Sequence, residues 1–203
     1  MYSLEDLFRN TKHGSSMFSA EEIRAVEDAV NLKGRIPYVE CLIRKKDVRL
    51  TPEEAVRQLY VHKLINVYGY PAELIKLEHA IHFGREVKRA DIVIFEKDHP
   101  DSEYIIVEVK KPRLTEGKEQ LRSYCNATGA LIGIWTNGER ADYYHRKEPN
   151  YFESISEIPN AKQKLSEILQ QRWTMEKLIE KNKLQDGKIT LKGVDITEQN
   201  DLL

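Results

Sequence analysis

The pattern of apolar and polar positions predicts two helices in the first third of the chain. Apolar residues recur at helical spacing after Ser19, which can form a capping box with Glu22. A second, longer helix is predicted from Thr51, with Pro52 in its first turn, to the helix-breaking GYP sequence at 69–71. The buried face of this helix is predicted to hold Val56, Leu59, Tyr60 and Leu64.

The centre of the chain has the short apolar runs that are typical of strands. One or two strands are predicted in 36–50, and single strands in 74–83, 89–95, 104–110 and 130–138. A helix is predicted over 115–129, between the last two strands, and ends at Gly129. Because a helix that joins two strands favours a crossover connection, we expect an α/β fold with a mixed central sheet flanked by helices.

The organisation along the chain suggests one domain with an extension at each side. A further helical stretch is predicted from about residue 159 onward. We therefore expect an N-terminal helical segment at 1–35, a core domain at 36–150, and a helical C-terminal tail, or connector to a further domain, at 151–203.

Composition narrows the class of protein. A chain of 203 residues is long enough for one full-size domain with a sizeable core. Charged residues make up 32% of it and no window is apolar enough for a membrane span. The sequence MYSLEDLFRN has acidic residues where a signal peptide needs a basic start and a long apolar stretch, so nothing suggests export. The two cysteines, Cys41 and Cys125, lie far apart, which argues against a disulfide framework. We expect a cytoplasmic protein.

The segment 104–110 ends in a carboxylate and an amine. Glu108 and Lys110 are two residues apart, so on a strand they project from the same face. Asp91, in the preceding predicted strand, can converge with Glu108 if the two strands form a hairpin. Two such carboxylates repel unless a cation bridges them, and Mg²⁺ prefers hard oxygen ligands. With a lysine to orient or deprotonate water, this set predicts metal-assisted phosphodiester hydrolysis.

Basic residues gather around the same segment, although the formal net charge of the chain is only −1. They are Lys88, Arg89, Lys110, Lys111, Arg113, Lys118 and Arg122. Such a cluster is either an ordinary solvated face or a track for a polyanion, and its position around the Glu108 strand favours DNA.

The order of these motifs resembles a known family. Asp91 followed by Glu108-Val109-Lys110 is similar to the D…ExK signature of the PD-(D/E)xK nuclease superfamily, with Ala90 where the signature has proline. Gln120 and Tyr124 match the QxxxY motif of a subset of these nucleases, and the upstream PEEAVRQ helix also has a counterpart there. Residues 50–138 resemble the N-terminal nuclease domain of type I restriction enzyme R subunits.

The resemblance implies a restriction-endonuclease-like fold and an Mg²⁺-dependent endonuclease that cleaves duplex DNA, with Mn²⁺ able to substitute. It implies Asp91, Glu108 and the Val109 carbonyl as metal ligands, Lys110 as the residue that positions water, and Glu54 as an additional acid. DNA contact or bracing of the site is implied for Gln120, Tyr124, Lys111, Arg113 and Arg122. The partners implied are double-stranded DNA and the motor, methylase or specificity domains or subunits of a restriction complex.

Other interpretations stay open at this point. The chain could be a non-catalytic nuclease-like module for DNA or subunit docking, or a free-standing DNA repair nuclease. Asp91, Glu108 and Lys110 could form only a surface ion-pair cluster. Glu53 and Glu54 could serve only to compensate the helix dipole.

Overall fold

A computed structural model describes residues 3–9, 11, 14–171, 175 and 177, together with the backbone of 190–191 and 194–195. The chain divides into two compact units, Met1–Lys162 and Gln163–Leu203. Among the residues described, no helix is both long and apolar enough to cross a membrane.

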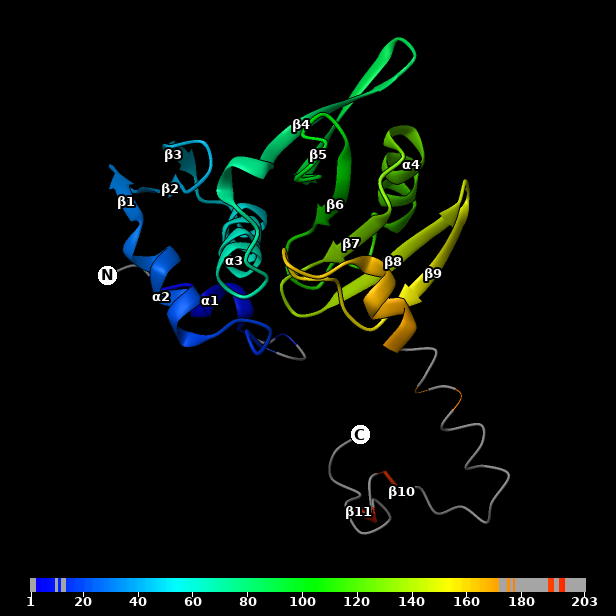
Figure 1. Ribbon diagram of the computed structural model, residues 1–203. Coiled ribbons are helices and arrows are strands. Elements are labelled where there is room, and N and C mark those ends of the chain that lie inside the picture. Colours follow the sequence, from blue (N-terminus) through cyan, green and yellow to red (C-terminus); the bar gives the residue numbers. More distant parts are fainter. Residues whose placement is uncertain are drawn as a thin grey trace. The chain divides into compact units, whose positions relative to one another are not determined.

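The first unit is built on a six-stranded sheet in the order β4-β5-β6-β7-β8-β9 (Figure 1). Its strands are β4 (Ile75–Phe83), β5 (Glu86–Phe95), β6 (Glu103–Val109), β7 (Ile132–Thr136), β8 (Ala141–Glu148) and β9 (Tyr151–Ile155). β6 and β7 are parallel, and all other neighbours in the sheet are antiparallel. The expected mixed sheet is confirmed.

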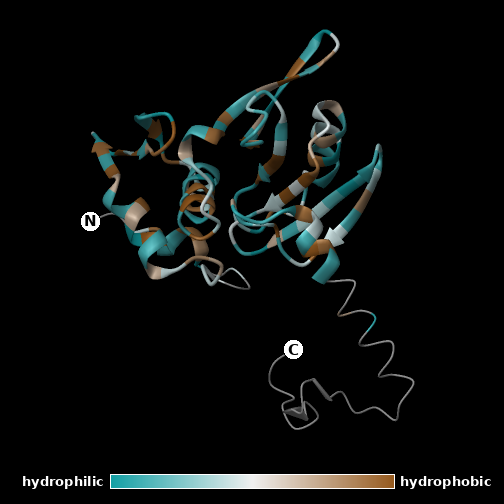
Figure 2. Cartoon of the chain, in the orientation of Figure 1, coloured by the Kyte–Doolittle hydropathy of each residue, from teal (hydrophilic) through white to brown (hydrophobic). Residues whose placement is uncertain are grey.

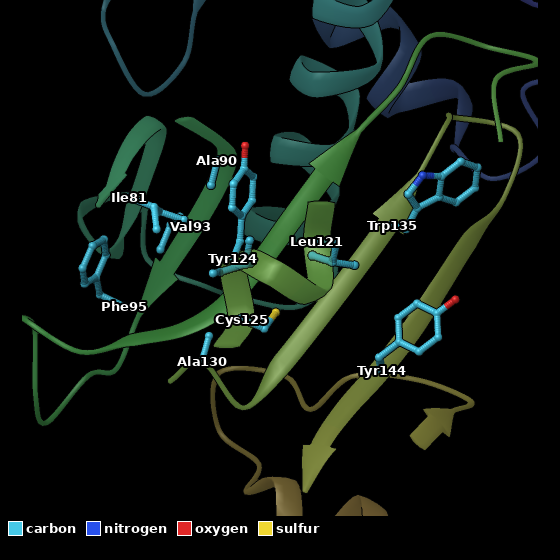
Figure 3. Packing of buried hydrophobic residues seen from close by; sticks show 11 residues of the cluster. Ile81, Ala90, Val93, Phe95, Leu121, Tyr124, Cys125, Ala130, Trp135 and Tyr144 are labelled. Atoms are coloured by element: carbon cyan, nitrogen blue, oxygen red, sulfur yellow. The ribbon is translucent and has the colours of Figure 1, made fainter. Parts of the chain in front are cut away.

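The helix α4 (Lys118–Thr128) makes the crossover between the parallel strands β6 and β7. It ends at Gly129, whose backbone is left-handed (φ 85°), as the sequence predicted. Leu121, Tyr124 and Cys125 from this helix pack in one buried cluster with strand residues such as Val93 and Ile106 (Figure 3). This cluster is the core on one face of the sheet.

The helix α3 (Pro52–Asn66) lies on the other face of the sheet, between it and the N-terminal elements (Figure 1). Thr51 caps it by accepting a hydrogen bond from the Glu54 backbone N–H at 3.1 Å. The predicted apolar face is buried, but so are the charged residues Glu54 and Arg57. Hydrophobic residues recur in α3 and in the central strands (Figure 2).

The N-terminal elements form a smaller subassembly of the same unit. They are α1 (Glu5–Phe8), α2 (Ala20–Asp28), β1 (Val30–Lys33), β2 (Ile36–Cys41) and β3 (Lys46–Arg49). A short 3₁₀ turn, η1 (Ala72–Leu74), lies between α3 and β4. The Ser19–Glu22 capping box of α2 is present, as predicted. β1, β2 and β3 form a separate antiparallel sheet, so the segment 36–50 holds two strands.

The hairpin of β8 and β9 has no counterpart in the sequence prediction. Its segment is rich in charged residues, and most of its side chains are only partly buried or exposed. The apolar alternation that identifies a strand is therefore weak. The predicted core segment 36–150 ends one residue before β9, and the segment 151–203, expected to be helical, begins with this strand.

The second unit is described only in part. A helix occupies 165–171, within the helical stretch predicted from about residue 159, and 175 and 177 also have helical backbone. The short strands β10 (Thr190–Leu191) and β11 (Val194–Asp195) pair antiparallel. Most of the predicted helical stretch after 171 lies outside the described residues.

Candidate active site

Two acidic side chains meet where β5 and β6 run side by side. Ile92 pairs with Val107, so Asp91 stands opposite Glu108 in the continuation of the same register. Both residues are buried, with exposed fractions of 9% for Asp91 and 1% for Glu108. Asp91 Oδ2 accepts a hydrogen bond from the Val109 backbone N–H at 2.7 Å. The sheet therefore fixes one oxygen of Asp91 directly beside Glu108.

Lys110 follows β6 and extends the same face of the strand. Its Nζ lies 2.5 Å from Glu108 Oε1, and its backbone N–H donates to the Thr136 carbonyl at 2.8 Å. Gly117, at the start of α4, leaves room for this side chain, because a Cβ there would lie 2.5 Å from Lys110 Cε. The structure thus brings Asp91, Glu108 and Lys110 together.

Arg57, on α3, is a central residue of the site that the sequence analysis did not select. One guanidinium nitrogen lies 2.5 Å from Asp91 Oδ1 and 3.0 Å from Glu78 Oε1, and the other contacts Glu54 Oε2. Burial lowers the pKa of Arg57, but the charges of Asp91 and Glu54 outweigh burial and leave that pKa raised. Arg57 therefore stays a cation. Arg57 follows Glu53 by four residues and Glu54 by three, so the three side chains share one side of the helix. This spacing was the sequence signal that could have identified Arg57 as part of the site.

Glu54, predicted as the additional acid, is buried and contacts Arg57 as Asp91 does, but both of its carboxylate oxygens accept hydrogen bonds. Oε1 accepts from Gln58 at 2.7 Å and from Arg44 at 3.3 Å, while Arg57 donates to Oε2. Its neighbour Glu53 is more exposed. The pKa of Glu53 is raised by burial and by the charge of Asp91. The two glutamates thus differ: Glu54 is held by its donors, and Glu53 faces the charge of Asp91.

Glu78 joins this cluster through an irregularity in β4. Leu77 pairs with Ile92 and His79 with Ala90, so Glu78 stands between two regular pairs opposite Asp91. Its backbone has a φ of 53°, which is uncommon for a residue other than glycine. Nothing in the sequence predicts this conformation, which places the Glu78 carboxylate against Arg57.

The donor set is chemically suited to a divalent cation. Glu108 Oε2 is buried and has no hydrogen-bond partner among the residues that the structure describes, an arrangement that is unfavourable for a polar oxygen unless something binds it. Burial, and next the charge of Asp91, raise the pKa of Glu108 to about 7. No three His, Cys, Asp or Glu side chains in the described part of the chain are grouped to hold a metal ion. Mg²⁺, however, commonly takes only one or two carboxylates together with waters. The residues present therefore fit such an ion.

The predicted QxxxY pair lies beside this cluster. Gln120 Nε2 donates to the Tyr124 hydroxyl at 2.7 Å, and that hydroxyl donates to the Arg89 carbonyl at 3.2 Å. Tyr124 thereby ties α4 to β5 two residues before Asp91. The same residues line a hollow of about 560 Å³. Its lining is formed by Val87, Lys88, Arg89, Gln120, Ser123 and Tyr124.

The other predicted DNA-contacting residues lie elsewhere. Lys111 is exposed and, with Arg113, lines a second hollow of about 410 Å³ next to α1. Arg113 donates from its guanidinium to the Arg9 carbonyl at 2.6 Å. Arg122 pairs with Glu119 at 2.8 Å and lies over the rings of Tyr144 and Phe152. The basic residues near the ExK strand therefore divide into separate groups.

The chain belongs to the family of the type I restriction enzyme R protein N terminus (HSDR_N), which matches residues 52–159, more than half of its length. Among curated proteins, none matches the chain.

Solved structures that resemble the chain share little sequence with it. A fragment assigned as an HsdR subunit of a type I restriction enzyme from Vibrio vulnificus YJ016 is 21% identical, with a TM-score of 0.44, over 59% of this chain and 25% of that one. A protein assigned as a nuclease of DUF820 from Anabaena variabilis ATCC 29413 is 16% identical, with a TM-score of 0.38, over 63% of this chain and 81% of that one. The type IIG restriction endonuclease BpuSI is 18% identical, with a TM-score of 0.38, over 66% of this chain and 17% of that one. The chain thus spans about a quarter of the length of the Vibrio protein.

Proposed function

We propose that this chain carries the Mg²⁺-dependent endonuclease domain of a restriction-modification system and hydrolyses phosphodiester bonds in duplex DNA. The observation that supports this most directly is the unpaired, buried oxygen of Glu108 beside Asp91, with Lys110 on the other oxygen. Membership of the R protein family supports the restriction context. Motor, methylase or specificity domains or subunits are the proposed partners, and the cytoplasm is the proposed location.

The roles of the residues follow from their contacts. Asp91, Glu108 and the Val109 carbonyl would hold the cation, which would neutralise phosphate charge and acidify a bound water. Burial lowers the pKa of Lys110, but its hydrogen bond to Glu108 and the charges of the neighbouring carboxylates together outweigh burial and leave that pKa raised. Lys110 is therefore proposed as a fixed ammonium that orients water and stabilises developing negative charge, rather than as a base.

Plasmid nicking tests the proposed activity. We expect the purified chain to nick supercoiled plasmid in Mg²⁺ or Mn²⁺ but not in EDTA, and Glu108→Gln to lower the rate by roughly 10²-fold or more. Glu73→Gln is the matched control, because Glu73 is exposed in η1. Unchanged nicking by the Glu108 variant would show that the metal site is misassigned.

The hollow beside the QxxxY pair is the proposed track for the DNA backbone. Lys88 and Arg89 lie in the exposed first part of β5, two or three residues from Asp91, and border this hollow together with Gln120. The adjoining β4–β5 hairpin extends away from the rest of the sheet (Figure 1). Phosphates held there would pass next to the acidic pair. Arg113 lines the separate hollow next to α1 and Arg122 packs over aromatic rings, so we give them smaller roles.

We expect this contact to be electrostatic and independent of sequence. The double variant Lys88→Ala/Arg89→Ala should bind duplex DNA about tenfold more weakly than the wild type and lower the salt slope by about 2. Fluorescence anisotropy with unrelated duplexes at two salt concentrations, in Ca²⁺ to prevent cleavage, measures both quantities. Lys46→Ala on β3 is the control. Preference for one duplex, or an affinity indifferent to salt, would contradict the assignment.

A non-catalytic docking module is the second candidate. Asp91 favours it, because each of its oxygens already has a donor: Arg57 on Oδ1 and the Val109 N–H on Oδ2. A carboxylate satisfied in this way does not require a metal. Salt-dependent DNA binding by the wild type without nicking in Mg²⁺ or Mn²⁺ would favour this candidate over the nuclease.

A further inference from the structure

Arg57 lies where the acidic side chains of the site converge. Its guanidinium contacts Asp91, Glu78 and Glu54, and Glu53 Oε1 lies 3.6 Å away. Its side chain is 8% exposed, so these are contacts between largely desolvated groups. We infer that Arg57 is the counter-cation of the metal-free site, and that a divalent cation can bind Asp91 only when Arg57 releases Asp91 Oδ1.

The two oxygens of Asp91 differ in how easily they can be released. Oδ2 accepts from the Val109 backbone N–H, and the β-sheet fixes the position of that donor. Oδ1 accepts from Arg57, whose long side chain has several rotatable bonds. A ligand that approaches Asp91 therefore competes with Arg57 and leaves the backbone contact intact.

Arg57 has other acceptors close by when it leaves Asp91. Glu54 and Glu78 already contact it, and Glu53 is one helical turn before it on α3. Its Nε is buried and lacks an acceptor among the described residues, so its present hydrogen bonding is incomplete. A move toward Glu53 would keep the guanidinium paired. The carboxylate cluster thus allows two positions for the Arg57 guanidinium, one on Asp91 and one nearer Glu53.

Arg57 is in this view a positioning residue that lowers the affinity of the site for metal. When it holds Asp91, the acidic pair is partly neutralised and its attraction for a second cation is weaker. When it shifts, both Asp91 Oδ1 and the unpaired Glu108 oxygen are available. The inference rests on the proposed metal site at Asp91 and Glu108.

Calorimetric titration with Ca²⁺ alone, in the absence of DNA, tests the exchange. We expect Arg57→Gln to bind Ca²⁺ about tenfold more tightly than the wild type, because a competing positive charge is gone. Arg44→Gln is the matched control: Arg44 contacts Glu54 at 3.3 Å but has no contact with Asp91, so its Ca²⁺ affinity should equal that of the wild type.

Recovery of the melting temperature by Ca²⁺ is a second readout, and a merely structural role would not produce it. In EDTA, Arg57→Gln should melt about 10 °C below the wild type, because desolvated carboxylates lose their counter-cation. Saturating Ca²⁺ should restore more than half of this loss. Arg44→Gln should melt at a lower temperature than the wild type by the same amount with and without Ca²⁺. If Arg57→Gln does not fold, Arg57→Lys, which keeps a charge but not the forked geometry, should show a smaller gain in Ca²⁺ affinity.

The outcomes separate this inference from the proposed function. If the wild type binds Ca²⁺ through Glu108, as shown by loss of binding in Glu108→Gln, but Arg57→Gln has equal or weaker affinity, the exchange is overturned and the metal site stands. If neither the wild type nor any Arg57 variant binds Ca²⁺, the proposed metal site and the exchange both fall. Tighter binding and Ca²⁺-dependent recovery by Arg57→Gln support both.

Discussion

Asp91→Ala should lower the free energy of unfolding of the metal-free chain by about 3–5 kcal/mol, the range for breaking one partner of a buried charge pair. Asp91 contacts Arg57 at 2.5 Å and accepts from the Val109 N–H at 2.7 Å. Alanine leaves a desolvated guanidinium with less neutralising charge and a buried backbone donor without its acceptor. The remaining contacts of Arg57 with Glu54 and Glu78 favour the lower end of the range.

Urea unfolding in EDTA measures this loss of stability. The variant Asp91→Asn separates the contribution of the charge from that of the hydrogen bond. Asparagine can still accept from the Val109 N–H but does not carry the charge that pairs with Arg57, so it should be intermediate. Asp47→Ala, in the exposed pair with Lys33, is the control and should unfold as the wild type does. An Asp91→Ala variant with unchanged stability would mean that the contact with Arg57 does not form in solution.

The acidic pair could be predicted because it depends on short-range periodicity. Glu108 and Lys110 share a face because strand residues alternate, and the chain between β5 and β6 is short enough for antiparallel pairing. That pairing is what places Asp91 opposite Glu108. The capping residue Thr51 and Pro52 likewise determine where α3 begins from local contacts alone.

The role of Arg57 could not be predicted in the same way. The contact with Asp91 joins residues 34 apart in sequence and depends on how α3 is rotated against the sheet. α3 is buried on most sides, so its apolar pattern does not indicate which charged residue faces the site. For the same reason, the sequence does not indicate whether Glu53 or Glu54 faces the site. Glu78 depends on a local backbone irregularity that has no sequence signal.

The spatial grouping of the basic residues likewise depends on contacts that are distant in sequence. Lys88 and Arg89 border a hollow beside the site, whereas Arg122 packs over aromatic rings from β8 and β9. These two strands alternate too weakly in polarity to be predicted, so the partners of Arg122 were unknown. A cluster of charges in sequence thus became separate groups in space.

Glu108 should affect stability in the opposite direction from Asp91. Burial, and next the charge of Asp91, raise its pKa in the folded chain from the ordinary value of 4.5 to about 7. Between these two values the folded state binds more protons than the unfolded state, so stability falls as the pH rises from about 4.5 to about 7. The stability that protonated Glu108 contributes is fully present below pH 4.5 and is lost above about pH 7. A shift of this size corresponds to about 3 kcal/mol.

Glu108→Gln should therefore be more stable than the wild type at pH 8 by about 2 kcal/mol and close to it at pH 5, when both are unfolded by urea in EDTA. The gain is less than the full shift because Glu108 of the unfolded chain is already largely ionised at pH 5, so part of the fall in stability has occurred by then. His62 and His145, whose pKa values are lowered by burial, change stability in the other direction, but they do so in both proteins and cancel in the difference. Ca²⁺ should stabilise the wild type at pH 8 and leave the variant unchanged. A difference in the free energy of unfolding that does not depend on pH would show that Glu108 is not a buried carboxylate with a raised pKa.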